Sequence, residues 1–131
     1  MLLPDPERPI IISVPDSLWL PVYTKPRCEK VLAEYCRRHG IPCYLPLMKR
    51  AQRYQRRTVK TYLPMFRSYL FAQLHPGTQS VLMESHKALR VVTVTPEQEG
   101  QLIGELQDIQ LMEAAQEQAE LIVLPDLVVG T

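Results

Sequence analysis

Cysteine and histidine are the residues of this chain that could bind a metal ion, and four of them lie close together in the sequence. They are Cys28, Cys36, His39 and Cys43. On a predicted helix, Cys28 and Cys36 lie about 12 Å apart along the axis. One Zn²⁺ ion, with bonds of about 2.3 Å to sulfur, cannot bind both. The other three could converge only through the loop after the helix, so we expect no metal, no cofactor and a buried, apolar Cys36.

Motifs of the common enzyme classes are missing from the sequence. Its five glycines form neither a G-x-G-x-x-G loop nor a P-loop, and no G-x-S-x-G nucleophile elbow occurs. The three histidines have no clear acidic or nucleophilic partner. We therefore expect a protein that is not an enzyme. The catalytic alternative, a small phosphate-ester hydrolase, lacks a convincing set of catalytic residues.

Charge is divided sharply along the chain, although the net charge is only +1. Residues 1–90 hold all fifteen Lys and Arg and six acidic residues, a net +9, whereas residues 91–131 hold eight acidic residues and no basic one. This asymmetry is typical of chains that bind nucleic acid or an acidic partner with one part. The alternative is a domain whose basic and acidic faces neutralise each other.

Basic and aromatic residues are also concentrated locally. Residues 49–60 hold six Lys and Arg and no acidic residue, and all nine aromatic residues lie between Trp19 and Phe71. The extended patterns on both sides of the basic stretch predict a long hairpin with a charged tip. No Asn-Gly or Asp-Gly turn marks that hairpin.

Strand and helix patterns must position these residues. Strand patterns cover residues 19–23, 43–49, 58–63, 65–74 and 90–94. Helix patterns cover residues 26–39, a short segment capped by Thr78, and residues 95–119, which begin with a capping box from Thr95 to Gln98. The order predicts an α+β fold, a ferredoxin-like split βαβ sandwich with an antiparallel four-stranded sheet. We expect helices mainly on one face, with the other face free for a partner.

Length and composition predict one domain with short ends. Four prolines in residues 1–17 indicate a flexible N-terminal tail, in which the apolar run 10–14 could either pack as a short extended piece or stay mobile. The domain spans 18–120, and 121–131 begin a linker. No apolar run reaches the ~18–20 residues that cross a bilayer, and no secretory signal begins the chain. Three cysteines argue against a disulfide scaffold. We expect a monomer in the cytoplasm, without a membrane partner.

Four segments, taken in order, resemble one family. They are W-L-P-V-Y-T-K-P-R-C-E-K from Trp19, G-I-P-C-Y-L-P-L from Gly40, L-P-M-F-R-S-Y-L-F from Leu63, and the strand from Arg90 to Thr95. Together they resemble the N-terminal (NGN) domain of NusG-type transcription factors, closest to the specialised paralogues of the RfaH kind. Arg67 and Ser68 replace the Pro-Gly or Pro-Asn turn of the family's third segment.

The resemblance implies a transcription elongation or antitermination factor that binds RNA polymerase. In the family, an aromatic patch on the sheet binds the clamp helices of the largest subunit, and the matching positions are Tyr23, Tyr69 and Phe71. The alternative is that this face is core beneath helices, which would leave Phe66 and Leu70 as the exposed set. An RNA-binding module of the RRM type is the competing function, although residues 66–71 lack the glycine of its central strand.

The resemblance also implies contact with the non-template DNA strand. The matching positions are Lys25, Arg27, Lys30 and Lys87, and the hairpin tip adds Arg53, Arg56 and Arg57 as nucleic-acid-binding candidates. Residues 125–131 resemble the linker to the family's KOW barrel, which we expect outside this chain. In the family that barrel recruits a ribosome or a termination factor.

Overall fold

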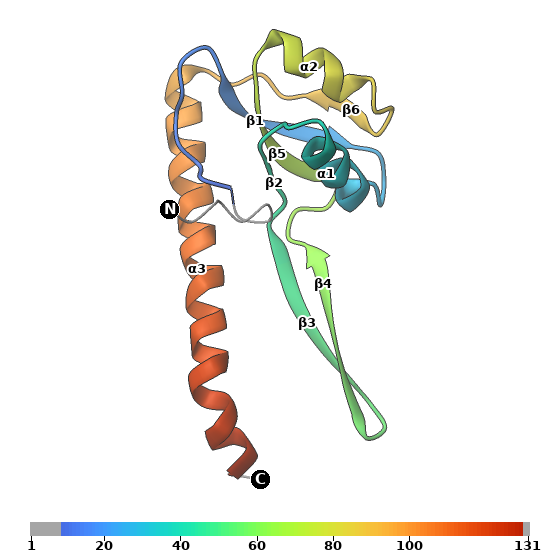
Figure 1. The fold of residues 1–131 in the computed structure, drawn as a ribbon, viewed down its shortest axis with the longest axis vertical. Helices are drawn as coiled ribbons and strands as arrows, with labels where there is room; N and C mark the ends of the chain where they lie inside the picture. Colours follow the sequence, from blue (N-terminus) through green and yellow to red (C-terminus); the bar gives the residue numbers. More distant parts are fainter. Residues whose placement is uncertain (1–8, 130–131) are drawn as a thin grey trace.

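The computed structural model describes residues 9–129, with side chains through Gln116 except that of Gln52. The elements, labelled in Figure 1, are β1 (Leu18–Thr24), α1 (Glu29–Arg38), β2 (Cys43–Tyr44), β3 (Leu47–Tyr54), β4 (Arg57–Pro64), β5 (Tyr69–Leu74), α2 (Pro76–Met83), β6 (Ala88–Val91) and α3 (Pro96–Val129). Among the described residues, no helix is both long enough and apolar enough to cross a membrane.

Four of the strands form one antiparallel sheet in the order β2-β5-β1-β6. β1 and β5 are its central pair, in register from Leu18 opposite Leu74 to Tyr23 opposite Tyr69. Helix α1 connects β1 to β2, and α2 connects β5 to β6. This order is that of a split βαβ plan, so the predicted α+β fold is confirmed.

One face of the sheet packs against α1 and α2. Alternate residues of the central strands point to this face, including Leu20 and Val22 of β1 and Leu70 of β5. They pack with Leu32 of α1 and Leu82 of α2, and Leu32, Val22, Leu70 and Leu82 are fully buried. This cluster is the main hydrophobic core.

The opposite face is covered in part by α3, which runs along the other side of the sheet (Figure 1). Trp19, Tyr44 and Phe71 pack there against Ile103 and Leu106 of α3. The face expected to stay free is therefore occupied at this end. β1 and β5 are apolar on both faces, a pattern typical of strands that are covered on both sides.

The segment before β1 also belongs to the domain. Ile11 is buried among Trp19 and the α3 residues. Glutamine side chains of α3 bind its backbone, because Gln107 donates to the carbonyl of Ile11 and Gln110 to that of Pro9, each at 2.7 Å. Residues 9–17 therefore differ from the expected tail, and residues 1–8 lie outside the described residues.

Helix ends differ from the predictions at three points. α1 begins at Glu29 rather than at Pro26, and α2 is capped by His75, whose Nδ1 accepts from the backbone of Gly77, while Thr78 closes the capping box. α3 continues past Ala119 to Val129. The predicted capping box at its start is confirmed, with reciprocal bonds between Thr95 and Gln98 of 2.9 and 3.1 Å.

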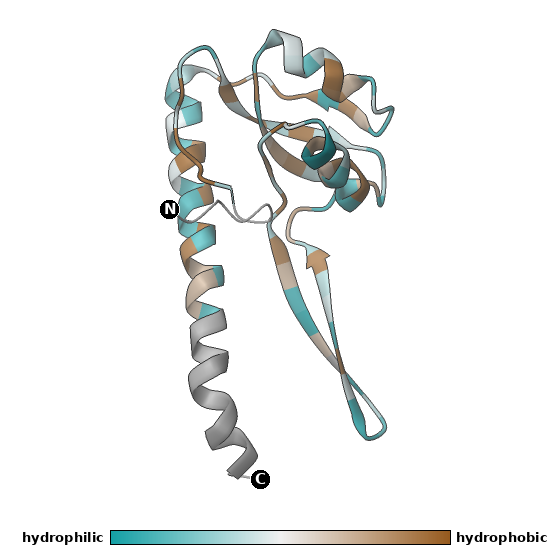
Figure 2. Ribbon diagram, viewed as in Figure 1, coloured by the Kyte–Doolittle hydropathy of each residue, from teal (hydrophilic) through white to brown (hydrophobic). Residues whose placement is uncertain are grey.

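β3 and β4 form a separate two-stranded hairpin that projects from the domain (Figure 1). Eight pairs continue from Leu47 opposite Pro64 to Tyr54 opposite Arg57. The predicted long hairpin is thus confirmed, with Gln55 and Arg56 in its turn and Gln55 in the left-handed region at φ 52°. Figure 2 shows hydrophobic residues near its base and hydrophilic residues toward its tip.

Candidate functional site

Two tyrosines lie side by side at the end of the sheet that α3 leaves uncovered. Tyr23 of β1 and Tyr69 of β5 are directly opposite in register, with ring centroids 5.2 Å apart and ring planes tilted by 54°. Both side chains are half-buried. The structure therefore brings together two of the three positions that the sequence assigned to polymerase binding.

Phe71 differs from the other two positions. It lies on the same face, two residues further along β5, where it packs with Trp19 beneath α3 and is only 7% exposed. Phe66, outside the predicted site, is 40% exposed and meets the Phe71 ring edge-on at 5.7 Å between centroids. Phe71 therefore supports the exposed aromatic surface from below, whereas Phe66 extends it.

A turn before β5 explains why Phe66 and Phe71 meet. The sequence predicted a continuous strand from Met65, in which strict alternation would place these two residues on opposite faces. Instead, the amide of Tyr69 donates to the carbonyl of Phe66 at 3.2 Å, and Ser68 takes the left-handed conformation at φ 66°. The turn shifts the alternation, and the strand begins only at Tyr69.

An arginine completes this surface. Arg90 of β6 is exposed and lies opposite Tyr23 in register, so the two residues share a face of the sheet. We call Tyr23, Phe66, Tyr69 and Arg90 the aromatic patch. Sequence reasoning missed Arg90, because only the pairing of β1 with β6 places it beside a tyrosine.

Two loops meet beside the patch and carry basic residues. The backbone amide of Lys25 donates to the carbonyl of Lys87 at 2.9 Å, which joins the end of β1 to the start of β6. Lys25 and Arg27 are exposed and Lys87 is half-buried. Arg27 has φ 61°, a left-handed backbone conformation. The structure thus brings together the loop after β1 and the loop before β6, which hold three of the residues predicted to contact DNA.

Lys30, in the first turn of α1, contacts the hairpin. Its ammonium group donates to the backbone carbonyl of Tyr62 in β4 at 2.6 Å. The neighbouring residue, Glu29, is 5% exposed and accepts from the amide of Ser68 at 2.9 Å. The first turn of α1 therefore holds the base of the hairpin and the turn before β5.

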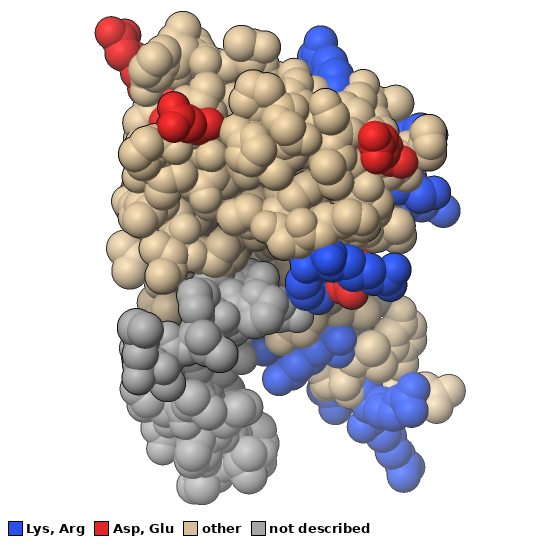
Figure 3. Space-filling view, turned by 45° about the horizontal axis from the view of Figure 1, so that its top comes forward, with Lys and Arg blue, Asp and Glu red and all other residues tan. Residues whose placement is uncertain are grey.

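The hairpin carries most of the remaining positive charge. Arg53, Arg56 and Arg57 are exposed at or near its tip. Figure 3 shows Lys and Arg side chains gathered on the hairpin and on the adjoining side of the domain. We call Lys25, Arg27 and Lys87 the loop cluster. The hairpin and the loop cluster therefore form a basic region next to the aromatic patch.

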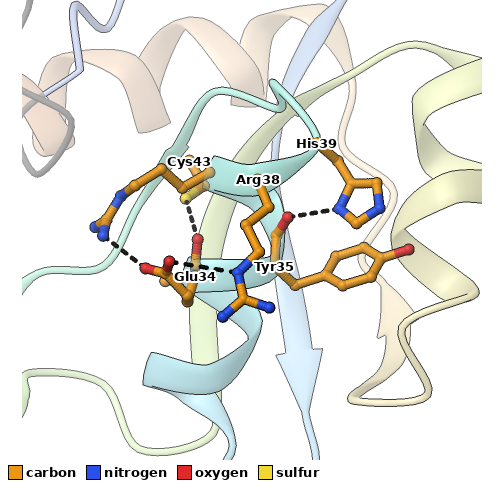
Figure 4. A network of polar contacts seen from close by, with 7 residues as sticks. Glu34, Tyr35, Arg38, His39 and Cys43 are labelled. Atoms are coloured by element: carbon orange, nitrogen blue, oxygen red, sulfur yellow. Dashed lines mark hydrogen bonds and ion pairs between the residues drawn. The ribbon is translucent and has the colours of Figure 1, made fainter.

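Two of the residues that could suggest a metal site, Cys43 and His39, make other contacts (Figure 4). The Cys43 thiol donates to the carbonyl of Ala33 at 3.6 Å, and His39 Nδ1 lies 2.9 Å from the carbonyl of Tyr35, on whose ring it stacks. A hydrogen bond with Cys43, together with burial, raises the pKa of the Cys36 thiol. Within the described part of the chain, no group of three or more potential ligands could hold a metal ion.

The chain thus forms an α+β domain of the split βαβ type, with an aromatic patch and a basic hairpin. The family model described as "Transcription termination factor nusG" matches residues 17–117, well over half of the chain. The chain therefore belongs to the NusG family, whose domains are transcription factors rather than enzymes. Membership indicates a transcription termination or elongation factor with RNA polymerase as its general partner. No curated protein matches the chain.

Proposed function

We propose that this protein is an elongation or antitermination factor of the specialised, RfaH-like kind that binds the clamp helices of RNA polymerase through the aromatic patch. The observation that carries the proposal is the Tyr23–Tyr69 pair at the uncovered end of the sheet. Both rings keep solvent-exposed surface, although the neighbouring Trp19 and Phe71 are covered by α3.

The chemistry of the patch suits a helical protein partner. Tyrosine buries a large apolar area and keeps a hydroxyl group that can form a hydrogen bond, so tyrosine and arginine often dominate binding energy at protein interfaces. Here Tyr23 and Tyr69 form the centre, with Phe66 and Arg90 at the edges. This arrangement supports a docking site with an aromatic centre and a charged rim.

The proposed mechanism is a shift between polymerase conformations. A factor that binds the clamp more tightly when it is closed stabilises that state, and the effect cannot exceed the difference between the two affinities. A closed clamp suppresses pausing. This action requires binding alone, which is consistent with a chain that lacks the common catalytic motifs.

The loop cluster is the proposed contact for the non-template DNA strand. Lys25 and Arg27 are exposed, and Lys87 adjoins Lys25 through their backbone hydrogen bond. Cations attract phosphate without reading sequence. We leave Lys30 out of this contact, because its ammonium group is bound to the Tyr62 carbonyl.

A transcription assay on paused elongation complexes tests this function. We expect the wild-type chain to shorten pauses, and the variant Tyr23→Ala/Tyr69→Ala to lose that effect while remaining folded. Arg27→Glu/Lys87→Glu should bind polymerase normally and lose the effect only at some pause sites. A chain that leaves pauses unchanged but binds RNA tightly without polymerase would overturn the proposal in favour of an RRM-like RNA-binding module.

A further inference from the structure

The pairing register of the hairpin distributes its cations over both of its faces. Residues that are paired in an antiparallel ladder share a face, and successive pairs alternate between the two faces. One face carries the pairs Arg50–Thr61 and Tyr54–Arg57, and the other carries Ala51–Lys60 and Arg53–Thr58. One face therefore presents Arg50 and Arg57, and the other presents Arg53, Lys60 and the half-buried Lys49 of the Lys49–Tyr62 pair. Arg56 lies in the turn between the strands.

These cations are available to bind a ligand. Arg50, Arg53, Arg57 and Lys60 are all exposed. Residues 47–64 contain no acidic residue, and none of the four forms an ion pair with another described residue. These four side chains therefore place exposed positive charge on both faces of the hairpin.

The base of the ribbon is fixed to the domain. The Lys30 ammonium group binds the Tyr62 carbonyl at 2.6 Å, and the amide of Met65 donates to the carbonyl of Pro46 at 2.7 Å. The first bond joins β4 to α1, and the second joins the two ends of the hairpin to each other next to the Leu47–Pro64 pair. The hairpin therefore presents its cations from a defined position.

We propose that the hairpin enters the major groove of duplex DNA, with each face against the phosphate row of one strand. A ribbon that lies on a single row of phosphates needs cations on one face only, whereas this ribbon carries them on both. The major groove of B-DNA is about 12 Å wide and admits a two-stranded ribbon. The major groove of duplex RNA is too narrow for side chains to enter, so the charge arrangement favours DNA. The inference deepens the proposed nucleic-acid contact and rests on it, but it does not depend on polymerase binding.

The salt dependence of DNA binding tests this geometry. The full 131-residue chain is titrated with a short DNA duplex at several salt concentrations. Each lost phosphate contact lowers the slope of log K against log salt by about 0.9. The variants Arg50→Gln/Arg57→Gln and Arg53→Gln/Lys60→Gln, one for each face, should each lower the slope by about 1.8. Arg37→Gln/Arg38→Gln, in which the changed residues are paired with Glu34 on α1, is the matched control and should leave the slope unchanged.

Several results would overturn the inference. If only one of the two face variants lowered the slope of log K against log salt, the ribbon would lie flat on a single strand. Equal or tighter binding of duplex RNA or single-stranded DNA, or no binding of duplex DNA, would also contradict it. Failure of the proposed function can be distinguished from failure of this inference. Both face variants should keep wild-type affinity for polymerase, whereas Tyr23→Ala/Tyr69→Ala should keep the wild-type salt slope of DNA binding.

Discussion

At the scale of single residues, Ser68 determines the shape of the aromatic patch. Its left-handed backbone turns the chain just before β5. Three hydrogen bonds hold the turn: its amide binds Glu29, its carbonyl accepts from Thr24, and Tyr69 binds Phe66. Serine occupies this conformation at a cost of about 1–3 kcal/mol, which these bonds offset.

Substitutions at Ser68 should show that cost. Ser68→Gly removes the steric strain but adds backbone entropy in the unfolded state, so we expect a gain in stability of up to about 1 kcal/mol. Ser68→Val should lose about 2 kcal/mol or more, because a β-branched residue is disfavoured at positive φ. Urea denaturation measures both values. A valine variant as stable as the wild type would contradict the account of this turn.

Phe71 and Phe66 should respond differently to truncation. Phe71 is buried beneath α3, so Phe71→Ala should cost about 3–5 kcal/mol of unfolding free energy. Phe66 is 40% exposed, and Phe66→Ala should cost about 1 kcal/mol or less. Chemical denaturation of the two variants gives the comparison. Similar losses would mean that the two rings are not divided between core and surface.

At the scale of elements, the first turn of α1 connects the sheet to the hairpin. Glu29 binds the turn before β5, and Lys30 binds β4. Glu29 is buried, whereas Glu34, one turn later, forms surface ion pairs with Arg37 and Arg38. The two glutamates of one helix therefore have different roles.

Alanine substitutions at these glutamates should separate the two roles. Glu29→Ala leaves the amide of Ser68 without its acceptor, which costs about 1–3 kcal/mol. Glu34→Ala removes exposed ion pairs that are worth at most about 1 kcal/mol. Thermal unfolding monitored by circular dichroism measures the difference. Equal effects would indicate that the Glu29 contact contributes no more than a surface pair.

Most elements could be predicted from local sequence, whereas their packing could not. The Thr95–Gln98 capping box and the apolar stripe of α3 predicted that helix, and the structure buries Ile103 and Leu106 of that stripe. Periodicity alone did not indicate which face of the sheet α3 covers. The turn at Ser68 was also missed, because its left-handed backbone is supported by Glu29, far away in sequence.

The surroundings of the candidate site residues could not be predicted for the same reason. The resemblance implied Tyr23 and Tyr69, and the pairing of β1 with β5 places them opposite each other. The resemblance placed Phe71 in the exposed patch. Its burial beneath α3 could not be predicted, because nothing in the local sequence indicates that α3 covers it. The resemblance implied a DNA contact for Lys30. Its bond to Tyr62 could not be predicted, because the two residues are distant in sequence.

At the scale of the whole molecule, the N-terminal segment joins α3 to the sheet. Ile11 fills the space between them, and the indole of Trp19 and the side chain of Gln73 both donate to the carbonyl of Ile12, at 3.1 and 3.2 Å. The buried carboxylate of Glu99 in α3 accepts from the amide of Trp19 at 2.7 Å. Helix, segment and sheet therefore form one packed unit behind the aromatic patch.

Neighbouring isoleucines provide a matched test of this role. Ile11 is 2% exposed and Ile10 is 63% exposed. Ile11→Ala should cost about 2–5 kcal/mol, whereas Ile10→Ala should change stability by about 0.5 kcal/mol or less. Denaturation monitored by Trp19 fluorescence reports directly on this part of the core. Equal stability of the two variants would show that the segment contributes nothing to the domain.

The aromatic patch and the basic hairpin are separate surfaces of the same domain. The patch lies at the uncovered end of the four-stranded sheet, and the hairpin is a sheet of its own. Changes in one surface should therefore leave the binding of the other unchanged in a folded variant, because no residue of the patch belongs to the hairpin. This separation allows the polymerase contact to be measured by itself.

The most direct test of the central claim is the affinity of the chain for core RNA polymerase, measured by equilibrium titration. The account predicts that Tyr23→Ala/Tyr69→Ala weakens binding about thirtyfold or more, because truncation of a central aromatic residue often costs about 2 kcal/mol. A peptide of the clamp helices should compete with the wild-type chain. Tyr62→Ala, which removes a tyrosine from a more exposed position on the hairpin, should keep wild-type affinity. Unchanged affinity of the folded double variant would contradict the claim that this patch binds polymerase.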